Sequence, residues 1–162
     1  MEKGLCTHVS KGDVKNLPGR DAIWLQTPET TGGNYNTVST TFYQPGVKVA
    51  PAHSHPYGEE TGYVVSGHGK VLIGDQVFEV EPGSVFLFPQ GVPHMVWNSG
   101  NEVMQLLFVY ANGPKASESI PHEDVDFPIF SPHWTSCFLK RFYCAVIIPQ
   151  NLLHQREFCA MM

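Results

Sequence analysis

Two histidines separated by one residue, with a carboxylate shortly after them, form the part of this sequence best suited to bind a metal ion. His53 and His55 lie two positions apart, so on an extended strand both imidazoles project from the same face. Residues 56–58 are turn-forming, and Glu60 begins an apolar run that could return as the paired strand. The Glu60 carboxylate would then lie near the two imidazoles, and His94 is a fourth candidate ligand further along the chain.

These residues belong to two longer patterns. Residues 53–67 read His-x-His-x4-Glu-x6-Gly, and residues 83–98 read Gly-x5-Pro-x-Gly-x2-His-x3-Asn. Together they resemble the two sequence motifs of the cupin superfamily, over roughly residues 38–110. The resemblance implies an all-β double-stranded β-helix, or jelly-roll barrel, that holds one divalent metal ion. The ligands that it implies are His53, His55, Glu60 and His94. It implies no single reaction, because cupins include dioxygenases, isomerases, decarboxylases, lyases, cyclases, storage proteins and sensor domains.

Three imidazoles and one carboxylate suit a divalent transition metal better than calcium, which prefers oxygen ligands. Iron, manganese, zinc, nickel, copper and cobalt all remain open. An octahedral ion would keep positions free for water, dioxygen or substrate. Glu59 is an alternative to Glu60, but the spacing to Gly67 favours Glu60. The other histidines are interpreted as ordinary core or surface residues: His8, His68, His122, His133 and His154.

The composition favours many short strands. The chain has 162 residues, 15 glycines and 13 prolines, and only 15% of its residues are charged. It is long enough for one domain with a sizeable core. We expect an N-terminal lead-in at residues 1–36, loose up to residue 20 and with a possible short strand at 22–26. The barrel follows at residues 37–111, and a polar exit segment and an apolar tail occupy residues 112–162.

About nine short strands are predicted. They are residues 22–26, 37–43, 47–55, 60–66, 68–73, 76–80, 84–88, 94–98 and 102–110. Gly74 and Asp75 predict a two-residue hairpin turn with glycine first. Residues 84–88 are almost entirely apolar, which predicts a strand buried on both faces.

The tail at residues 129–162 has no place in the two motifs. It is rich in Phe, Cys, Leu and Ile. One interpretation is a strand at 142–148 and a helix at 151–162 that close a barrel end or a subunit interface. The alternative is an appendage that packs poorly. Most single-barrel cupins are dimers, so the resemblance implies a homodimer, and the apolar tail fits that expectation.

Alternation along the strands predicts which other side chains face the site. If Glu60 faces the interior, so do Gly62, Val64 and Ser66. Gly62 would then either leave room for a substrate or permit a bulge or a close strand approach. Gln105, if it faces inward, could hydrogen-bond a metal-bound oxygen; if it faces outward, it is an ordinary solvated residue.

The charge pattern bears on the partners. The net charge is −5 and no basic cluster occurs, which argues against nucleic acid and anionic membranes as partners. No segment reads as a signal peptide or a membrane span, so a cytoplasmic protein is expected. Between residues 46 and 111 the only cations are Lys48 and Lys70. We therefore expect no arginine clamp in the barrel and predict a small, neutral, partly hydrophobic ligand.

Two classes of function are compatible with these features. The first is a metal-dependent enzyme acting on a small organic molecule, either an oxygenase or an isomerase, cyclase or lyase that uses the metal as a Lewis acid. The second is a non-catalytic barrel that binds or senses a small molecule. No acid or base is visible beyond metal-bound water and Glu60, which favours binding, while the absence of a recognisable DNA-binding segment weakens a transcription-factor version.

Overall fold

The structure, a computed structural model, describes residues 6–112 and 115–128. The chain divides into two units, Met1–Phe127 and Pro128–Met162, and every strand given below belongs to the first unit. The strand predicted at residues 142–148 and the helix predicted at residues 151–162 lie outside the described residues. Within the part that is described, no helix has the length and apolar character needed to cross a bilayer.

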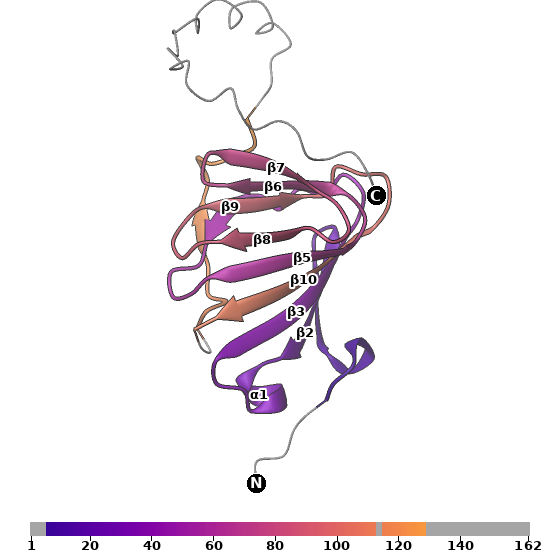
Figure 1. Ribbon diagram of the computed structural model, residues 1–162, viewed down its shortest axis with the longest axis vertical. Helices are drawn as coiled ribbons and strands as arrows, with labels where there is room; N and C mark the ends of the chain where they lie inside the picture. Colours follow the sequence, from indigo (N-terminus) through magenta and orange to yellow (C-terminus); the bar gives the residue numbers. More distant parts are fainter. Residues whose placement is uncertain (1–5, 113–114, 129–162) are drawn as a thin grey trace, which may run out of the picture. The chain divides into compact units, whose positions relative to one another are not determined.

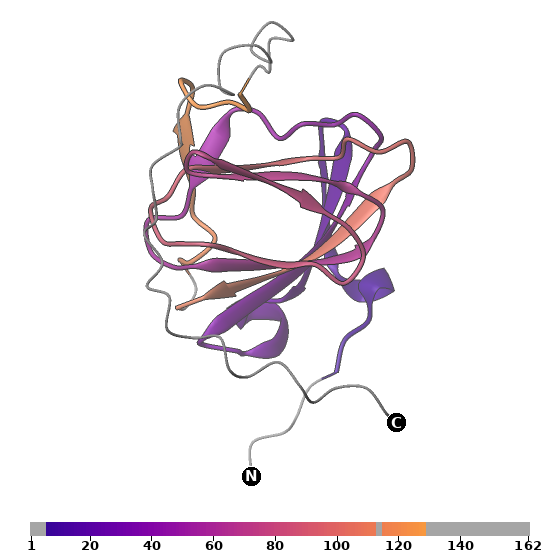
Figure 2. The same ribbon diagram turned by 45° about the horizontal axis from the view of Figure 1, so that its top comes forward.

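Two antiparallel β-sheets lie opposite each other in the first unit (Figures 1 and 2), which confirms the predicted all-β jelly-roll fold. The first sheet contains, in spatial order, β1 (Asp13–Leu17), β2 (Arg20–Gln26), β3 (Asn36–Tyr43), β10 (Met104–Ala111), β5 (Glu60–Ser66) and β8 (Val85–Phe88). The second contains β11 (Ile120–His122), β4 (Ala52–Ser54), β9 (His94–Trp97), β6 (Gly69–Ile73) and β7 (Gln76–Val80). A short 3-10 helix, Val9–Lys11, precedes β1, and α1 (Pro28–Thr31) follows β2. The chain crosses between the sheets after β3, β4, β5, β7, β8, β9 and β10, so both sheets are built from one interleaved run of strands.

The first 36 residues contain more regular structure than their sequence predicts. The expectation of a loose lead-in up to residue 20 is wrong, because Asp13–Leu17 forms β1 and pairs with β2 along its whole length. Gly19 occupies the connecting turn with φ of 70°, a conformation that glycine adopts at little cost. β2 in turn pairs with β3, so this hairpin widens the first sheet by two strands.

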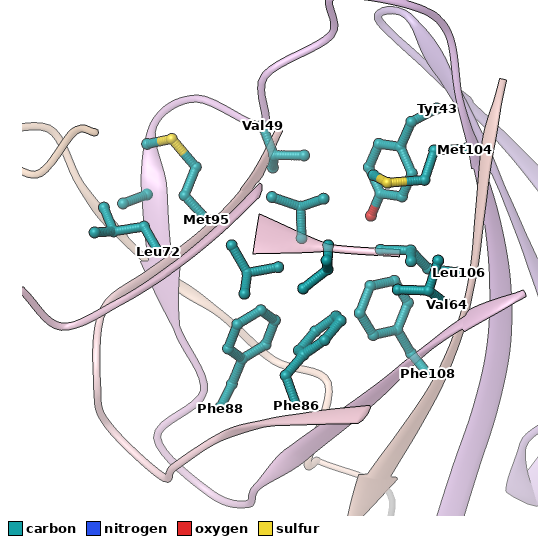
Figure 3. Packing of buried hydrophobic residues seen from close by; sticks show 14 residues of the cluster. Tyr43, Val49, Val64, Leu72, Phe86, Phe88, Met95, Met104, Leu106 and Phe108 are labelled. Carbon is teal, nitrogen blue, oxygen red and sulfur yellow. The ribbon is translucent and has the colours of Figure 1, made fainter. Parts of the chain in front are cut away.

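Side chains from alternate positions of the strands in both sheets fill the space between the sheets. In the first sheet, Leu106 on β10 pairs with Val64 on the neighbouring strand β5, and Phe108 pairs with Gly62. Figure 3 shows the cluster from nearby; its larger members are Tyr43, Leu72, Phe86, Phe88, Met95, Met104, Leu106 and Phe108. This apolar interior holds the two sheets together and surrounds the site described below.

The prediction that residues 84–88 form a strand buried on both faces is only partly right. Val85 and Leu87 are 67% and 44% exposed, so β8 is buried on one face and not on both. β8 is the edge of its sheet, and none of the described residues covers its outer face.

The predicted hairpin at Gly74 and Asp75 is confirmed as the turn between β6 and β7. Ile73 pairs with Gln76 there, and Gly74 has φ of 60°.

Candidate metal centre and its cavity

Three of the four predicted ligands lie on strands, and the fourth lies just after the end of one of these strands. His53 on β4 lies directly opposite His94 on β9 in the second sheet. His55 follows the end of β4, and Glu60 begins β5 in the first sheet. Each of the four residues offers one nitrogen or oxygen atom, and these atoms all lie within 4.8 Å of one another. The alternative carboxylate, Glu59, is exposed, because neighbouring residues of a strand point to opposite faces.

Hydrogen bonds to main-chain carbonyls orient two of the imidazoles. His55 Nδ1 lies 2.8 Å from the carbonyl oxygen of Glu118, and His94 Nδ1 lies 2.9 Å from that of Val92. A ring that donates through Nδ1 directs Nε2 toward the cluster, which is the arrangement that fixes a metal-binding histidine. The ring of Phe88 stacks on that of His94 at a centroid distance of 4.0 Å and further restricts its rotation.

Glu60 is at the centre of the cluster. Its Oε2 atom lies 2.9 Å from His55 Nε2 and 3.3 Å from His94 Nε2. Burial opposes ionisation of Glu60, but the hydrogen bond from His55 and the proximity of His94 outweigh it and lower the pKa of Glu60 to about 2. Burial also lowers the pKa of His55, yet the hydrogen bond and charge of Glu60 outweigh it and raise that pKa overall.

His53 is held neutral near neutral pH. The pKa of His53 is lowered to about 4, first by burial and then by the neighbouring His94. Near neutral pH the cluster therefore offers an ionised carboxylate and a neutral imidazole, the protonation states that ligate metals. His55 and Glu60 would release the proton that they share on binding a divalent cation.

One nitrogen in the cluster lacks a partner. His94 Nε2 is buried and makes no hydrogen bond to any described residue, since its approach to Glu60 lacks the required geometry. Leaving a buried polar atom unpaired is unfavourable, and a cation among the four donors would remove that cost. Three nitrogen donors and one oxygen donor match the preferences of divalent transition metals, so the residues present fit such an ion.

A cavity of about 140 Å³ adjoins the cluster. Most of its wall is apolar or aromatic and includes Trp24, Val49, Phe88, Val96 and Phe108. The hydroxyl oxygen of Tyr43 points into the interior in Figure 3. The site is thus a largely apolar chamber with the candidate metal-binding cluster on one side.

Two tyrosines of this chamber are polar groups that the sequence reasoning overlooked. Burial and the negative charge of Glu60 raise the pKa of both Tyr43 and Tyr110. Both hydroxyls therefore remain protonated and can donate hydrogen bonds to a ligand. Tyr110 lies directly opposite Glu60 in the β10–β5 pairing, and Phe108, two residues earlier, also lines the cavity. The two-residue period from Phe108 was the signal that could have identified Tyr110.

The two residues considered for substrate contact do not line the cavity. A Cβ atom at Gly62 would lie 2.2 Å from the ring of Phe86, so the space beside this glycine is filled by that ring. Gln105 Nε2 donates a hydrogen bond to Thr40 Oγ1 at 3.1 Å. Ser66, predicted to face inward, is exposed, because the pairing shifts register between Gln105 and Leu106 and breaks the alternation.

The cavity does contain an arginine, contrary to our expectation. No arginine occurs between residues 46 and 111, but Arg20 on β2 and Lys15 on β1 both line the cavity. The motif region contains no arginine, but the N-terminal hairpin outside it forms one side of the chamber. A Leu-Pro-Gly turn at residues 17–19, flanked by short segments, was the available signal.

Comparisons with known proteins agree with this geometry. Residues 40–110 match the protein family described as Cupin domain. Polyketide synthase CurC from Streptomyces cyaneus is 28% identical over 124 residues, which are 74% of this chain and 79% of that protein.

Two solved structures share the fold. Oxalate decarboxylase from Lactobacillus farciminis, in a formate complex, has a TM-score of 0.63 and 22% identity over 70% of this chain, which spans only 34% of the decarboxylase chain. A conserved protein with a double-stranded β-helix domain from Klebsiella pneumoniae has a TM-score of 0.60 and 22% identity, over 75% of this chain and 99% of that chain.

Proposed function

Because this chain is a cupin-domain protein, we propose that it binds one divalent transition metal and is a metal-dependent enzyme acting on a small organic molecule. The proposed ligands are His53, His55, Glu60 and His94. The observation that carries the proposal is the convergence of their donor atoms within 4.8 Å. The unpaired nitrogen of His94 and the ionised state of Glu60 support it.

A divalent ion held there supplies Lewis acidity toward a carbonyl or enol oxygen and, if it is redox-active, reactivity toward dioxygen. The protein's own groups have separate roles. The protonated hydroxyls of Tyr43 and Tyr110 can donate hydrogen bonds to an oxygen on which negative charge develops. Phe88 and Phe108 exclude water from the chamber, and this exclusion strengthens those hydrogen bonds.

The substrate that we propose is a small conjugated carbonyl compound, such as a polyketide fragment. Two features support this choice: the aromatic wall of the cavity, and the similarity to a protein named polyketide synthase. We expect Lewis-acid chemistry, as in an isomerase, cyclase or lyase. An oxygenase would use the same ligands and is distinguished by oxygen consumption during turnover.

The metal proposal is tested by analysing the purified protein before and after chelation and after reloading with iron, manganese, zinc, nickel, copper or cobalt. We expect one tightly held ion per chain and its loss in Glu60→Gln. The matched control is His68→Ala, which removes an exposed histidine outside the cluster. A folded protein that retains none of these ions, and whose melting temperature none of them raises, would contradict the proposal.

Turnover is tested with the loaded protein and a panel of 1,3-diketones and polyphenols. Substrate loss without oxygen uptake supports Lewis-acid catalysis, and equimolar oxygen uptake supports an oxygenase. One observation favours a non-catalytic binding barrel instead: among the described residues that line the cavity, no carboxylate or imidazole remains outside the metal-binding set. Saturable binding of these compounds without conversion would support that alternative.

We also propose, from the sequence, a cytoplasmic homodimer that binds neither nucleic acid nor membranes. Light scattering on the eluting protein at several concentrations tests the dimer, and a monomeric mass throughout would contradict it.

A further inference from the structure

We propose that the cavity contains a second subsite, formed by Arg20 and Lys15, that binds the carboxylate of an acidic ligand whose size is close to that of a single aromatic ring. This inference builds on the proposed function only in placing the other end of the ligand toward the metal cluster. It replaces the neutral ligand predicted from residues 46–111 with an organic acid.

Arg20 is placed to reach the chamber. It begins β2, where it lies opposite Leu17 on β1 and Tyr43 on β3, and all three residues line the cavity. Its side chain is half-buried. Its positive charge also contributes to lowering the pKa of His53, although less than burial and His94 do, which is consistent with a guanidinium that faces the same interior.

No protein carboxylate neutralises this guanidinium among the described residues. Arg20 forms no salt bridge and no side-chain hydrogen bond within that part of the chain. Glu60 is the one carboxylate among the described cavity residues, and it is already hydrogen-bonded to His55 at 2.9 Å. The planar fork of an arginine is suited to bidentate binding of a carboxylate, and here that capacity is unused.

The charges of the chamber add to the same conclusion. Two cations, Lys15 and Arg20, face one ionised carboxylate, Glu60, so the charge of these side chains is +1. A divalent metal ion would raise it to +3. A partly enclosed site with this excess of positive charge favours an anionic ligand over a neutral one of the same shape.

Trp24 supplies the remaining wall of the subsite. Its ring stacks on that of Tyr110 at 5.5 Å, and the ammonium group of Lys15 lies 5.2 Å from its centre. The indole Nε1 atom is buried and has no hydrogen-bond partner among the described residues, so it can donate a hydrogen bond to an oxygen of the ligand. The cavity of about 140 Å³ is close to the volume of about 150 Å³ that admits benzene in an engineered protein, which limits the ligand to about one ring.

The test compares benzoate with benzamide, its neutral analogue of similar shape, by titration calorimetry on the full chain in metal-loaded and chelated forms. We expect benzoate to bind more tightly than benzamide. Arg20→Gln should weaken the affinity for benzoate about tenfold or more and change the affinity for benzamide by no more than about twofold. Arg20→Lys should retain part of the preference, because it keeps the charge but loses the planar fork. Lys70→Gln is the matched control, since Lys70 pairs with Glu79 outside the cavity.

Equal affinities for benzoate and benzamide in the wild-type protein would overturn the proposal, and so would benzoate binding that Arg20→Gln leaves unchanged. The wild-type comparison decides the matter even if Arg20→Gln fails to fold. Metal content is measured on the same samples. A chain that binds no metal but still prefers benzoate through Arg20 would refute the proposed function while supporting the acid subsite. A chain that binds metal without preferring benzoate would support the proposed metal site and refute the acid subsite.

Discussion

The two sides of the cavity differ in how firmly their functional groups are held. The metal wall, His53, His55, Glu60 and His94, is deeply placed: Glu60 is 3% and His94 1% exposed. Two of its imidazoles donate hydrogen bonds to main-chain carbonyls. The hairpin wall, Lys15, Arg20 and Trp24, stands on the β1–β2 edge of the first sheet, where every residue of β1 is exposed.

This difference matches the roles that we propose for the two sides. Metal ligands must be held within a fraction of an ångström, and buried hydrogen-bonded partners provide that precision. A side that selects the organic ligand can stand on an edge hairpin, because replacements there do not disturb the core. We therefore expect substitutions in the metal wall to abolish metal binding and substitutions in the hairpin wall to alter ligand choice with little effect on folding.

The largest expected effect follows from removing a metal ligand. We expect His94→Ala to weaken metal affinity by more than about 100-fold, since loss of a supporting residue alone costs about 10- to 100-fold. Competition with a chromophoric chelator measures the affinity, and His8→Ala is a suitable control because His8 is exposed and outside the cluster. Unchanged affinity in His94→Ala would remove the distinction between the two walls.

A smaller effect is expected beside the metal wall, at Gly62. A methyl group there would meet the Phe86 ring at 2.2 Å, and overpacking of this kind costs about 1–3 kcal/mol. Denaturant unfolding of Gly62→Ala measures the loss of stability. Combining it with Phe86→Leu tests the cause, because the second change should cost less in the presence of the first than alone. Strictly additive losses would show that the Phe86 ring is not the obstacle.

The metal-free protein should lose stability as the pH falls. His53 has a folded pKa of about 4 and an ordinary value of 6.5, so the unfolded chain takes up a proton first and stability is lost between pH 6.5 and 4. Glu60, with its pKa lowered to about 2, adds a loss as the pH falls from 4.5 toward 2. His55 acts in the opposite sense, because its raised pKa gives stability that is present below pH 6.5 and lost as the pH rises through its folded value.

Melting temperatures of chelated protein between pH 7 and 4 check this expectation. The decline should be several degrees smaller in His53→Gln, which removes the largest titrating contribution in this interval. Bound metal should reduce the decline near neutral pH, because it keeps the imidazoles unprotonated. The same slope in His53→Gln and wild type would mean that this histidine is as easily protonated in the folded chain as in the unfolded one.

The metal wall could be predicted from the sequence because its information is local. Two motifs with fixed spacings contain all four candidate ligands, and the resemblance to cupins assigns them to one site. The fold follows from the same motifs and from turn signals such as Gly74 and Asp75. The motif spacings and the turn signals are local features, which a single sequence contains.

The hairpin wall could not be predicted in this way. Arg20 reaches the cavity only because β2 pairs with β3, and register between strands is a long-range property. β1 has no apolar alternation to announce it, since both its faces are exposed. Ser66 was placed on the wrong face for a related reason: the irregularity opposite Gln105 interrupts the alternation and leaves no trace in the residue types.

The smallest expected effect concerns the outermost residue of the hairpin wall. Lys15 is exposed, and its contact with described residues is the approach of its ammonium group to the Trp24 ring at 5.2 Å, an interaction worth about 0.5–1 kcal/mol at such a site. Lys15→Gln should therefore lower the free energy of unfolding by less than about 1 kcal/mol. It should weaken benzoate binding severalfold, which is less than the effect of Arg20→Gln, because a lysine acts as a point charge. Denaturant unfolding and calorimetry on the same preparation measure both quantities. A large loss of stability with unchanged benzoate affinity would mean that this edge of the sheet supports the fold and not the ligand, which reverses the assignment of the two walls.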